Sequence, residues 1–371
     1  VQDAIWNSIN DVGYLSGLSY SNLLYETNEI NFDPEWIYFD EYNQDTDWIN
    51  EITQTGFYTD NSFSMSGGGE KAIYRVSLGY LNEIGTTVGT SFNRFSSLIS
   101  VNYKFSEKLR VNADLSYAKS NKNGSWTMKE LRSPRGLAMS KMPNMSPYVI
   151  DDEGNRTGEY FTPLFNFQGG FSGEAKHMVY NPVAMVNESI NHSVGENARA
   201  IFRLEYDIIE DLQYFGTIGF DLRSNKNKNF LPQSVTGVLW TDPFFNRSSD
   251  ILSDELYLNT ENKFIYNKYL TDKHKILLTA ILQTNEAQNY KYVSETSGNA
   301  SPSLSDPTTG AAVLAMESGS SKTRMLGLIG NAHYSFDDRY ILSAGYRLEA
   351  NSSLGANSRW AAFPTVGAAW H

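Results

Sequence analysis

Apolar and polar side chains alternate with a period of two over long segments of this chain, and this pattern limits its fold more than any other feature. In residues 110–117 every second position is apolar, with Val111, Ala113, Leu115 and Tyr117. The same alternation runs through residues 197–206, 212–223 and 340–349. Successive side chains of a strand point to opposite faces of a sheet. The pattern therefore predicts β-strands with one apolar and one polar face.

A tyrosine followed by a short charged turn joins consecutive alternating segments four times, at Tyr103, Tyr206, Tyr266 and Tyr334. Two alternating segments joined by a short polar turn are typical of an antiparallel hairpin. A tyrosine ring with its hydroxyl suits a membrane interface. The segments run to about ten residues, which is the length that a tilted membrane strand needs. We therefore expect an all-β, antiparallel transmembrane β-barrel.

Composition agrees with a barrel and excludes other classes. The chain has 371 residues, and 40% of them are hydrophobic, but no stretch approaches the roughly 18 apolar residues of a membrane-spanning helix. Inside lipid, only a closed sheet would then satisfy the backbone hydrogen bonds. A net charge of −12 argues against nucleic-acid binding. The absence of cysteine excludes disulfides and thiolate metal sites.

The predicted connections are short at one edge of the sheet and long at the other. The long ones are residues 121–195, 224–254 and 290–320. Short periplasmic turns and longer extracellular loops are typical of outer-membrane barrels. We expect residues 1–371 to form one partial barrel of about eleven strands, with a weaker strand candidate at residues 13–25. A short helix is predicted at residues 181–190, beginning at Pro182.

Several phrases in the first third of the chain carry a family resemblance. They are residues 47–52 (DWINEI), 63–71 (FSMSGGGEK), 74–80 (YRVSLGY) and 82–85 (NEIG). In this order they resemble the SusC/RagA-like TonB-dependent outer-membrane transporters. Residues 340–347 and 359–370 also look like the strands of that family's barrel. The resemblance covers most of residues 45–370 and thins in the long loops.

The resemblance implies a role that alternation alone does not give. The chain would be about half of a barrel of about 22 strands, without the family's plug domain. It would lie in the outer membrane of a Gram-negative, Bacteroidota-like cell and import glycan oligomers or peptides. The implied partners are a SusD-like surface lipoprotein, TonB acting through the plug segment, and outer-membrane lipid. Neither an enzymatic activity nor a cofactor is implied.

An aromatic and acidic segment at residues 33–48 is the candidate ligand site. Aromatic faces beside carboxylates can stack on sugar rings, and the rings in question belong to Trp36, Tyr38, Phe39, Tyr42 and Trp48. The same residues would also serve as an interface girdle packed on neighbouring strands, which is routine in barrels. We favour packing over binding.

Other polar groups have simpler structural interpretations. Carboxylates gather at residues 151–155 without the ligand spacing of an EF-hand, so a solvated turn is favoured over a calcium site. Charged side chains on the predicted inward face are expected to pair with one another or with a plug, more than to line a substrate path. These are Arg110, Asp114, Arg199, Arg203, Glu205, Asp221, Arg223, Arg347 and Glu349.

Two alternatives remain open from the residues. One is a passive porin or structural barrel of about 12 strands that closes by itself. The other is a soluble β-rich domain that binds or hydrolyses glycans, which would need two carboxylates about 5 to 10 Å apart in a cleft. The lipid-facing alternation has no use in a soluble domain.

Overall fold

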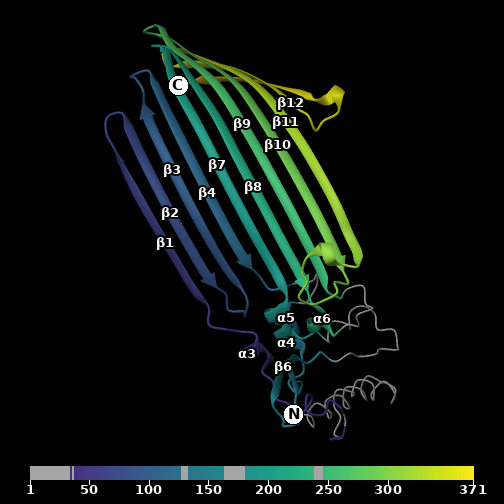
Figure 1. Ribbon diagram of the computed structural model, residues 1–371. Coiled ribbons are helices and arrows are strands. Elements are labelled where there is room, and N and C mark those ends of the chain that lie inside the picture. The colour runs from purple at the N-terminus through teal and green to yellow at the C-terminus, as the bar shows by residue number, and fades with distance from the viewer. Residues whose placement is uncertain (1–33, 36, 127–132, 163–179, 238–244) are drawn as a thin grey trace.

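The computed structural model describes residues 34–35, 37–126, 133–162, 180–237 and 245–371. Eleven strands form one sheet in chain order, and every neighbouring pair is antiparallel (Figure 1). They are β1 (Phe57–Gly68), β2 (Ala72–Ile84), β3 (Ser91–Lys104), β4 (Leu109–Asn123), β7 (Ile190–Ile209), β8 (Leu212–Leu231), β9 (Arg247–Thr271), β10 (His274–Ser297), β11 (Ala312–Phe336), β12 (Tyr340–Asn351) and β13 (Trp360–Trp370). The prediction of an all-β antiparallel sheet of about eleven strands is confirmed.

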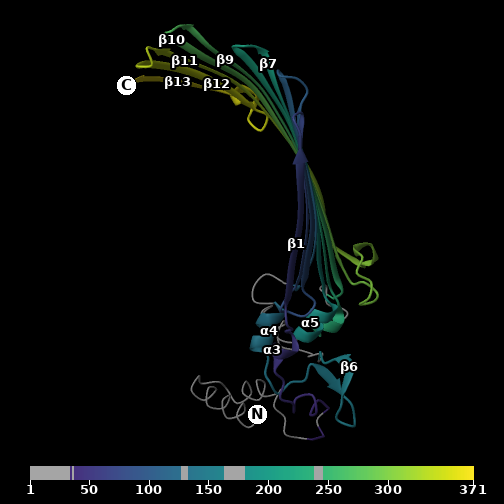
Figure 2. The ribbon, with the colours of Figure 1, turned by 90° about the vertical axis from the view of Figure 1, so that its left-hand side faces the viewer.

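The sheet is strongly curved and has one concave and one convex face (Figure 2). Within the described residues, β1 and β13 each pair on one side only, so the sheet is an open half-barrel. Five hairpin turns lie together at one end of the sheet, which we call the turn end. The opposite end, where the longer connections lie, is the loop end. In Figure 1 the turn end is at the top.

The central strands are longer than the alternation predicts. Strands β9 and β11 each have 25 residues, so their ends extend into the segments expected to be long loops. Both faces become polar near the loop end, as in residues 224–229 (SNKNKN), yet the backbone pairing continues there. A period-two pattern needs one apolar face. The pattern therefore disappears near the loop end, although the strand pairing continues there.

The strands are inclined to the row of tyrosines. Tyr103 pairs with Val111 on β4, and Val111 pairs with Leu204 on β7, which lies two positions before Tyr206. The same offset of two recurs between Tyr206 and Tyr266 and again between Tyr266 and Tyr334. A step of two residues, about 7 Å, over two strand spacings, about 9.6 Å, gives a tilt of about 35°. This value lies within the roughly 35–45° of membrane barrels, and all four tyrosines lie near the turn end.

The loop end carries small elements outside the main sheet. They are the strand pair β5 (Tyr148–Ile150) and β6 (Arg156–Tyr160), the helices α3 (Trp48–Glu51), α4 (Pro134–Ser140), α5 (Pro182–Glu188) and α6 (Gln233–Thr236), and the 3-10 turn η2 (Pro307–Thr309). A further 3-10 turn, η3 (Ala356–Ser358), follows β12, whose last residue, Asn351, pairs with Met325 well before the loop end of β11. Helix α5 confirms the helix predicted to begin at Pro182. The strand candidate at residues 13–25 lies outside the described residues. Among the helices that the structure describes, none has the length and apolar character of a membrane span.

Candidate functional site

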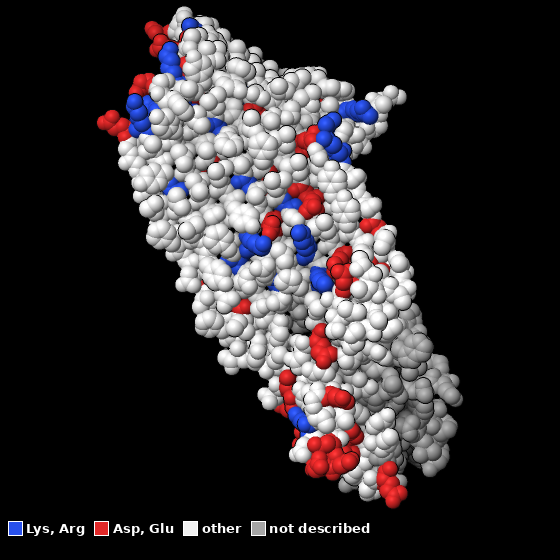
Figure 3. Space-filling view, viewed as in Figure 1, with Lys and Arg blue, Asp and Glu red and all other residues white. Residues whose placement is uncertain are grey.

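The convex face carries a continuous apolar band. Side chains predicted to face lipid are exposed there, including Leu115, Phe202, Phe220 and Leu342, the last of them 55% exposed. Figure 3 shows this face, with few charged side chains between the turns at the top and a group of charges across the middle. A water-soluble core would have buried these four side chains. Their exposure supports a surface in contact with lipid.

The apolar band ends, on the side of the loop end, at a row of polar residues about ten positions along the strands from the tyrosines. Counting ten positions along the strand from Tyr103, Tyr206 and Tyr334 reaches Asn93, Glu196 and Arg324 on the same convex face. Ten residues at a tilt of about 35° span about 28 Å, which is close to the roughly 25 Å apolar band of membrane barrels. We call the charged residues at this boundary the outward belt, and they are Lys119, Glu196, Asp254, Glu286, Lys322 and Arg324. Lys119 pairs with Glu196 at 2.7 Å, and Glu286 pairs with Lys322 and Arg324 at 2.6 Å each.

Hydrogen-bonded polar pairs also lie within the band itself, as between the Thr260 and Thr284 hydroxyls at 2.6 Å. The Tyr214 hydroxyl donates a hydrogen bond of 2.6 Å to the side-chain oxygen of Asn262. Tyr214 reaches this residue across Gly216, where a Cβ atom would lie 2.8 Å from the hydroxyl. A polar group in hydrocarbon is costly unless it is hydrogen-bonded. The glycine therefore makes room for a bond that satisfies Asn262.

On the concave face, charged side chains pair with one another across neighbouring strands. Arg110 contacts Glu205 at 3.0 Å and Asp207 at 3.2 Å. Asp114 accepts hydrogen bonds from Arg203 at 2.6 Å and from Ser100 at 2.5 Å. These pairs link β3, β4 and β7 on the inward side, as the sequence predicts for this face.

A second inward cluster surrounds Arg223. Its guanidinium pairs with Asp221 at 3.0 Å and with Glu255 at 3.9 Å, and it lies 5.3 Å from the centre of the Tyr257 ring. Nearer the other edge, Arg347 pairs with Glu349 at 2.5 Å. Arg199 forms no ion pair with any residue that the structure describes. The inward face thus has a largely self-compensated charge pattern suited to a polar lumen.

The aromatic segment predicted as a ligand site is divided by the fold. Tyr42 is 1% exposed and Trp48 is 3% exposed, and both belong to the apolar cluster under α3, α4 and α5. The Tyr42 ring packs edge-on against Phe161 at 5.5 Å, and the Trp48 indole N–H donates to the Met142 carbonyl at 2.8 Å. At these two positions, burial supports the packing interpretation, because neither ring is presented to solvent.

The remaining three aromatic residues differ from these two. Tyr38 is half-buried and packs against the same cluster, and Phe39 is half-buried as well. Trp36 lies outside the described residues. Tyr38 also packs on Phe161, with ring centres 5.6 Å apart. Of the described candidates, Tyr38 and Phe39 are the two that stay partly exposed.

Asn181 holds the loop-end cluster together, and the sequence analysis did not single it out. Its side-chain oxygen accepts hydrogen bonds from the backbone N–H groups of Val183 and Ala184, which caps α5. Its amide donates to the carbonyls of Pro147 at 2.7 Å and Phe161 at 3.1 Å. The residue is 1% exposed. An asparagine immediately before a helix-starting proline was the available signal, but its two tertiary partners are distant in sequence.

The acidic segment at residues 151–155 forms a turn. Asp151 Oδ1 accepts hydrogen bonds from the backbone N–H groups of Glu153 and Asn155, at 3.1 and 2.6 Å. Its carboxylate is therefore engaged by the turn itself. Within the part of the chain that the structure describes, no group of three or more His, Cys, Asp or Glu side chains is arranged to hold a metal ion.

Comparison with known proteins agrees with this geometry. No family model matches the chain. Two similar curated proteins are TonB-dependent receptor P3 of Formosa agariphila, 23% identical over 88% of this chain and 31% of the relative, and TonB-dependent receptor SusC of Bacteroides thetaiotaomicron, 22% identical over 88% of this chain and 32% of the relative. The chain therefore spans about a third of the length of these relatives.

Among solved structures, the RagAB peptide importer in its closed-closed state superposes with a TM-score of 0.65. The match is 19% identical and covers 88% of this chain and 35% of that one. Sequence and fold together show that this chain resembles the barrel of SusC- and RagA-like TonB-dependent transporters. It is an outer-membrane β-barrel segment with about half of such a barrel's roughly 22 strands. Its relatives are receptors rather than enzymes.

Proposed function

We propose that this chain, as a relative of the SusC- and RagA-like transporters, forms the wall and loops of an importer of glycan oligomers or peptides across the outer membrane. The observation that supports this proposal is the sheet itself, which has a lipid-facing band about 28 Å tall on one face and paired charges on the other. Such a wall separates lipid from a polar lumen. The similar proteins are TonB-dependent receptors and a peptide importer, and they support import as the use of that lumen.

The loop end is the proposed extracellular side, and the turn end is the proposed periplasmic side. The connections at the loop end are long, at residues 124–189, 232–246 and 298–311, whereas the hairpins at the turn end are short. This asymmetry is typical of outer-membrane barrels. A SusD-like lipoprotein would cover the loop end, and TonB would act from the periplasmic side through a plug segment. Tyr38 and Phe39 are then the candidate aromatic contacts for substrate near the mouth.

The orientation is testable by single-cysteine labelling of the full-length protein in intact cells. Residues 1–371 contain no cysteine. Any cysteine elsewhere in the full-length protein is first replaced by serine, so that each introduced thiol reports on one position. Gly154→Cys, in the turn between β5 and β6, should react with a membrane-impermeant maleimide added outside. Glu107→Cys, in the β3–β4 turn, should react only after the outer membrane is permeabilised. The reverse pattern would overturn the orientation.

Uptake experiments separate the importer from a passive porin. Cells lacking the full-length gene should lose uptake of a labelled oligosaccharide or peptide pool, and the restored gene should recover it. If import depends on TonB, a protonophore should abolish the uptake. Uptake that persists with the protonophore and follows the concentration gradient would favour the passive barrel instead.

A further inference from the structure

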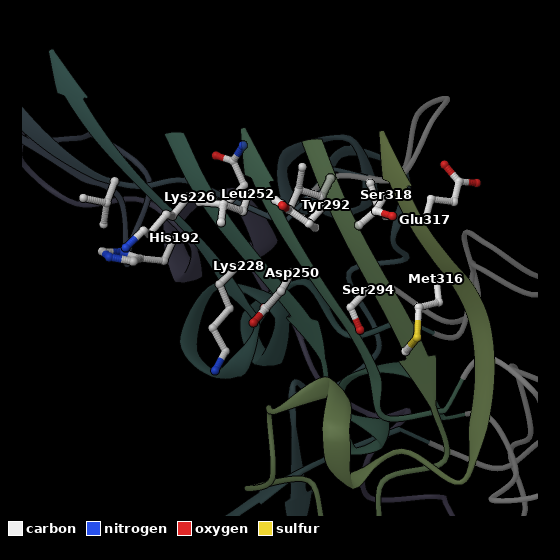
Figure 4. Close-up of a pocket in the computed structure, with 14 residues that line it drawn as sticks. His192, Lys226, Lys228, Asp250, Leu252, Tyr292, Ser294, Met316, Glu317 and Ser318 are labelled. Atoms are coloured by element: carbon white, nitrogen blue, oxygen red, sulfur yellow. The ribbon is translucent and has the colours of Figure 1, made fainter. Parts of the chain in front are cut away.

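A hollow of about 650 Å³ lies on the convex face of the sheet, beyond the outward belt (Figure 4). Its floor consists of two adjacent rows of paired residues that cross five strands. One row runs through Val194, Lys226, Leu252, Tyr292 and Ser318, and the other through His192, Lys228, Asp250, Ser294 and Met316. The floor is apolar at Val194, Leu252 and Met316, and the Tyr292 ring is 49% exposed.

The hollow lies next to the membrane interface. On β7 the hollow begins at Val194, two positions beyond the belt residue Glu196, whereas on β10 Tyr292 lies six positions beyond the belt residue Glu286. Two residues of a tilted strand correspond to about 6 Å of height. The headgroup layer adds about 5 to 8 Å on each side of the hydrocarbon core. The β7 side of the hollow therefore lies at the level of the lipid headgroups, and the floor rises toward β10 and β11 to about 17 Å beyond the belt at Tyr292.

A chain segment bounds the hollow on its far side. The connection between β10 and β11 folds onto the convex face, where the Ser248 hydroxyl donates to the Ser305 carbonyl at 2.6 Å and the Thr296 hydroxyl donates to the Pro307 carbonyl at 2.8 Å. Ser248 and Thr296 are buried beneath it. The result is a recess between this overhang and the membrane.

The polar groups in the recess have unused binding capacity. Lys226 and Lys228 form no ion pair with residues that the structure describes, in contrast to the paired lysines of the outward belt. Asp250 lies beside Lys228 (Figure 4). One carboxylate oxygen of Asp250 is buried and accepts no hydrogen bond from any described residue. Burial raises the pKa of this carboxyl, with Lys228 opposing the effect and Asp306 adding to it.

We propose that this recess binds the phosphorylated sugar headgroup of an outer-leaflet glycolipid. The Lys226 and Lys228 ammonium groups would bind the phosphate, since charge-assisted hydrogen bonds are strong where water is partly excluded. The sugar ring would lie over Tyr292 and Leu252, and a sugar hydroxyl would donate to Asp250. The assignment rests on the proposed function for its orientation, because only the loop end as the outer side places the recess at the outer leaflet.

Lipid binding to the full-length protein, purified in detergent, tests the assignment. The probe is bisphosphorylated lipid A, compared with a fully dephosphorylated form and with inorganic phosphate. The variant is Lys226→Gln with Lys228→Gln. The matched control is Lys122→Gln with Lys291→Gln, which removes the same charge on the concave face at a similar level of the sheet. We expect binding to the bisphosphorylated form to weaken about tenfold or more in the variant and to remain unchanged in the control.

A second variant and a cross-linker complete the test. Tyr292→Ala should weaken the binding of the phosphorylated and the dephosphorylated lipid alike, because the substitution removes the ring under the sugar. Equal lipid binding by all variants would overturn the proposal, and so would full competition by inorganic phosphate at equal concentration. A photo-cross-linker at Met316 that captures a protein in cells, instead of a glycolipid, would also overturn it. If Gly154→Cys still labels from outside in these cases, the proposed orientation stands and only this inference fails.

Discussion

At the residue scale, the structure shows how single polar groups are tolerated in unfavourable places. Asn262 faces lipid on β9, but the Tyr214 hydroxyl donates to it across the space left by Gly216. Asn181 is fully buried under the loop end, and its side chain makes four hydrogen bonds to backbone groups. In both cases some partners lie far away in sequence: the donor to the Asn262 oxygen is Tyr214, and the Asn181 amide donates to the carbonyls of Pro147 and Phe161.

Removing the donor to Asn262 should destabilise the barrel. We expect Tyr214→Phe to lower the unfolding free energy of the full-length protein by about 1–2 kcal/mol, because Asn262 is left without its partner in the apolar band. Urea titration of protein folded into lipid vesicles measures the change. The double variant with Asn262→Leu should recover most of it. Equal stability of the wild type and Tyr214→Phe would contradict the assigned bond.

The overhang between β10 and β11 should loosen in acid. Thr308 donates to Asp306 Oδ1 from its backbone N–H at 2.9 Å and from its hydroxyl at 2.8 Å, and these bonds lower the pKa of Asp306 below its usual 3.8. The stabilisation is complete above pH 3.8 and is lost as the pH falls through the lowered pKa. Hydrogen exchange in residues 298–311, corrected for the intrinsic rate, should therefore accelerate below that pH. Asp306→Asn should remove this pH dependence, and its persistence in the variant would rule out Asp306 as the cause.

At the element scale, the decisive property of each strand is where its convex face changes from apolar to charged. On β11 the change occurs at Arg324, ten positions from Tyr334, and the strand continues to Ala312. The apolar stretch could be predicted from sequence because alternation marks it. The part beyond the outward belt could not, since residues 312–323 (AVLAMESGSSKT) no longer alternate between apolar and polar, although the hydrogen-bond pairing with β10 continues there.

A charge placed inside the band should cost more than the same charge placed beyond it. Leu328 lies near the middle of the band on β11, and Ser320 lies beyond the outward belt on the same strand and face. Leu328→Arg should reduce the free energy of folding into vesicles by about 2–4 kcal/mol, and Ser320→Arg by about 0–1 kcal/mol. If the two variants are equally stable, the boundary at the belt is misplaced.

At the scale of the whole molecule, the sheet formed by the described residues has two edges, on β1 and β13, and each of these strands pairs on one side only. Unpaired backbone groups in hydrocarbon are costly, and membrane barrels avoid them by closing. Residues 1–371 expressed alone should therefore fail to give a compact barrel that shifts its electrophoretic mobility on heating. The full-length protein is the matched control and should show that shift. A heat-modifiable monomer formed by these residues alone would instead support the self-closing porin.

The sequence by itself determined the strand alternation, the antiparallel hairpins, the tyrosine level and the lipid-facing side, because all of these depend on neighbours within about ten residues. The tertiary structure alone decided the tilt, the depth of the band and the burial of Tyr42 and Trp48 in the loop-end cluster. It also placed Lys226, Lys228, Asp250 and Tyr292 together in one recess. These features arise from register between strands that are tens of residues apart, and a side chain's partners across a sheet leave no periodic trace in its own segment.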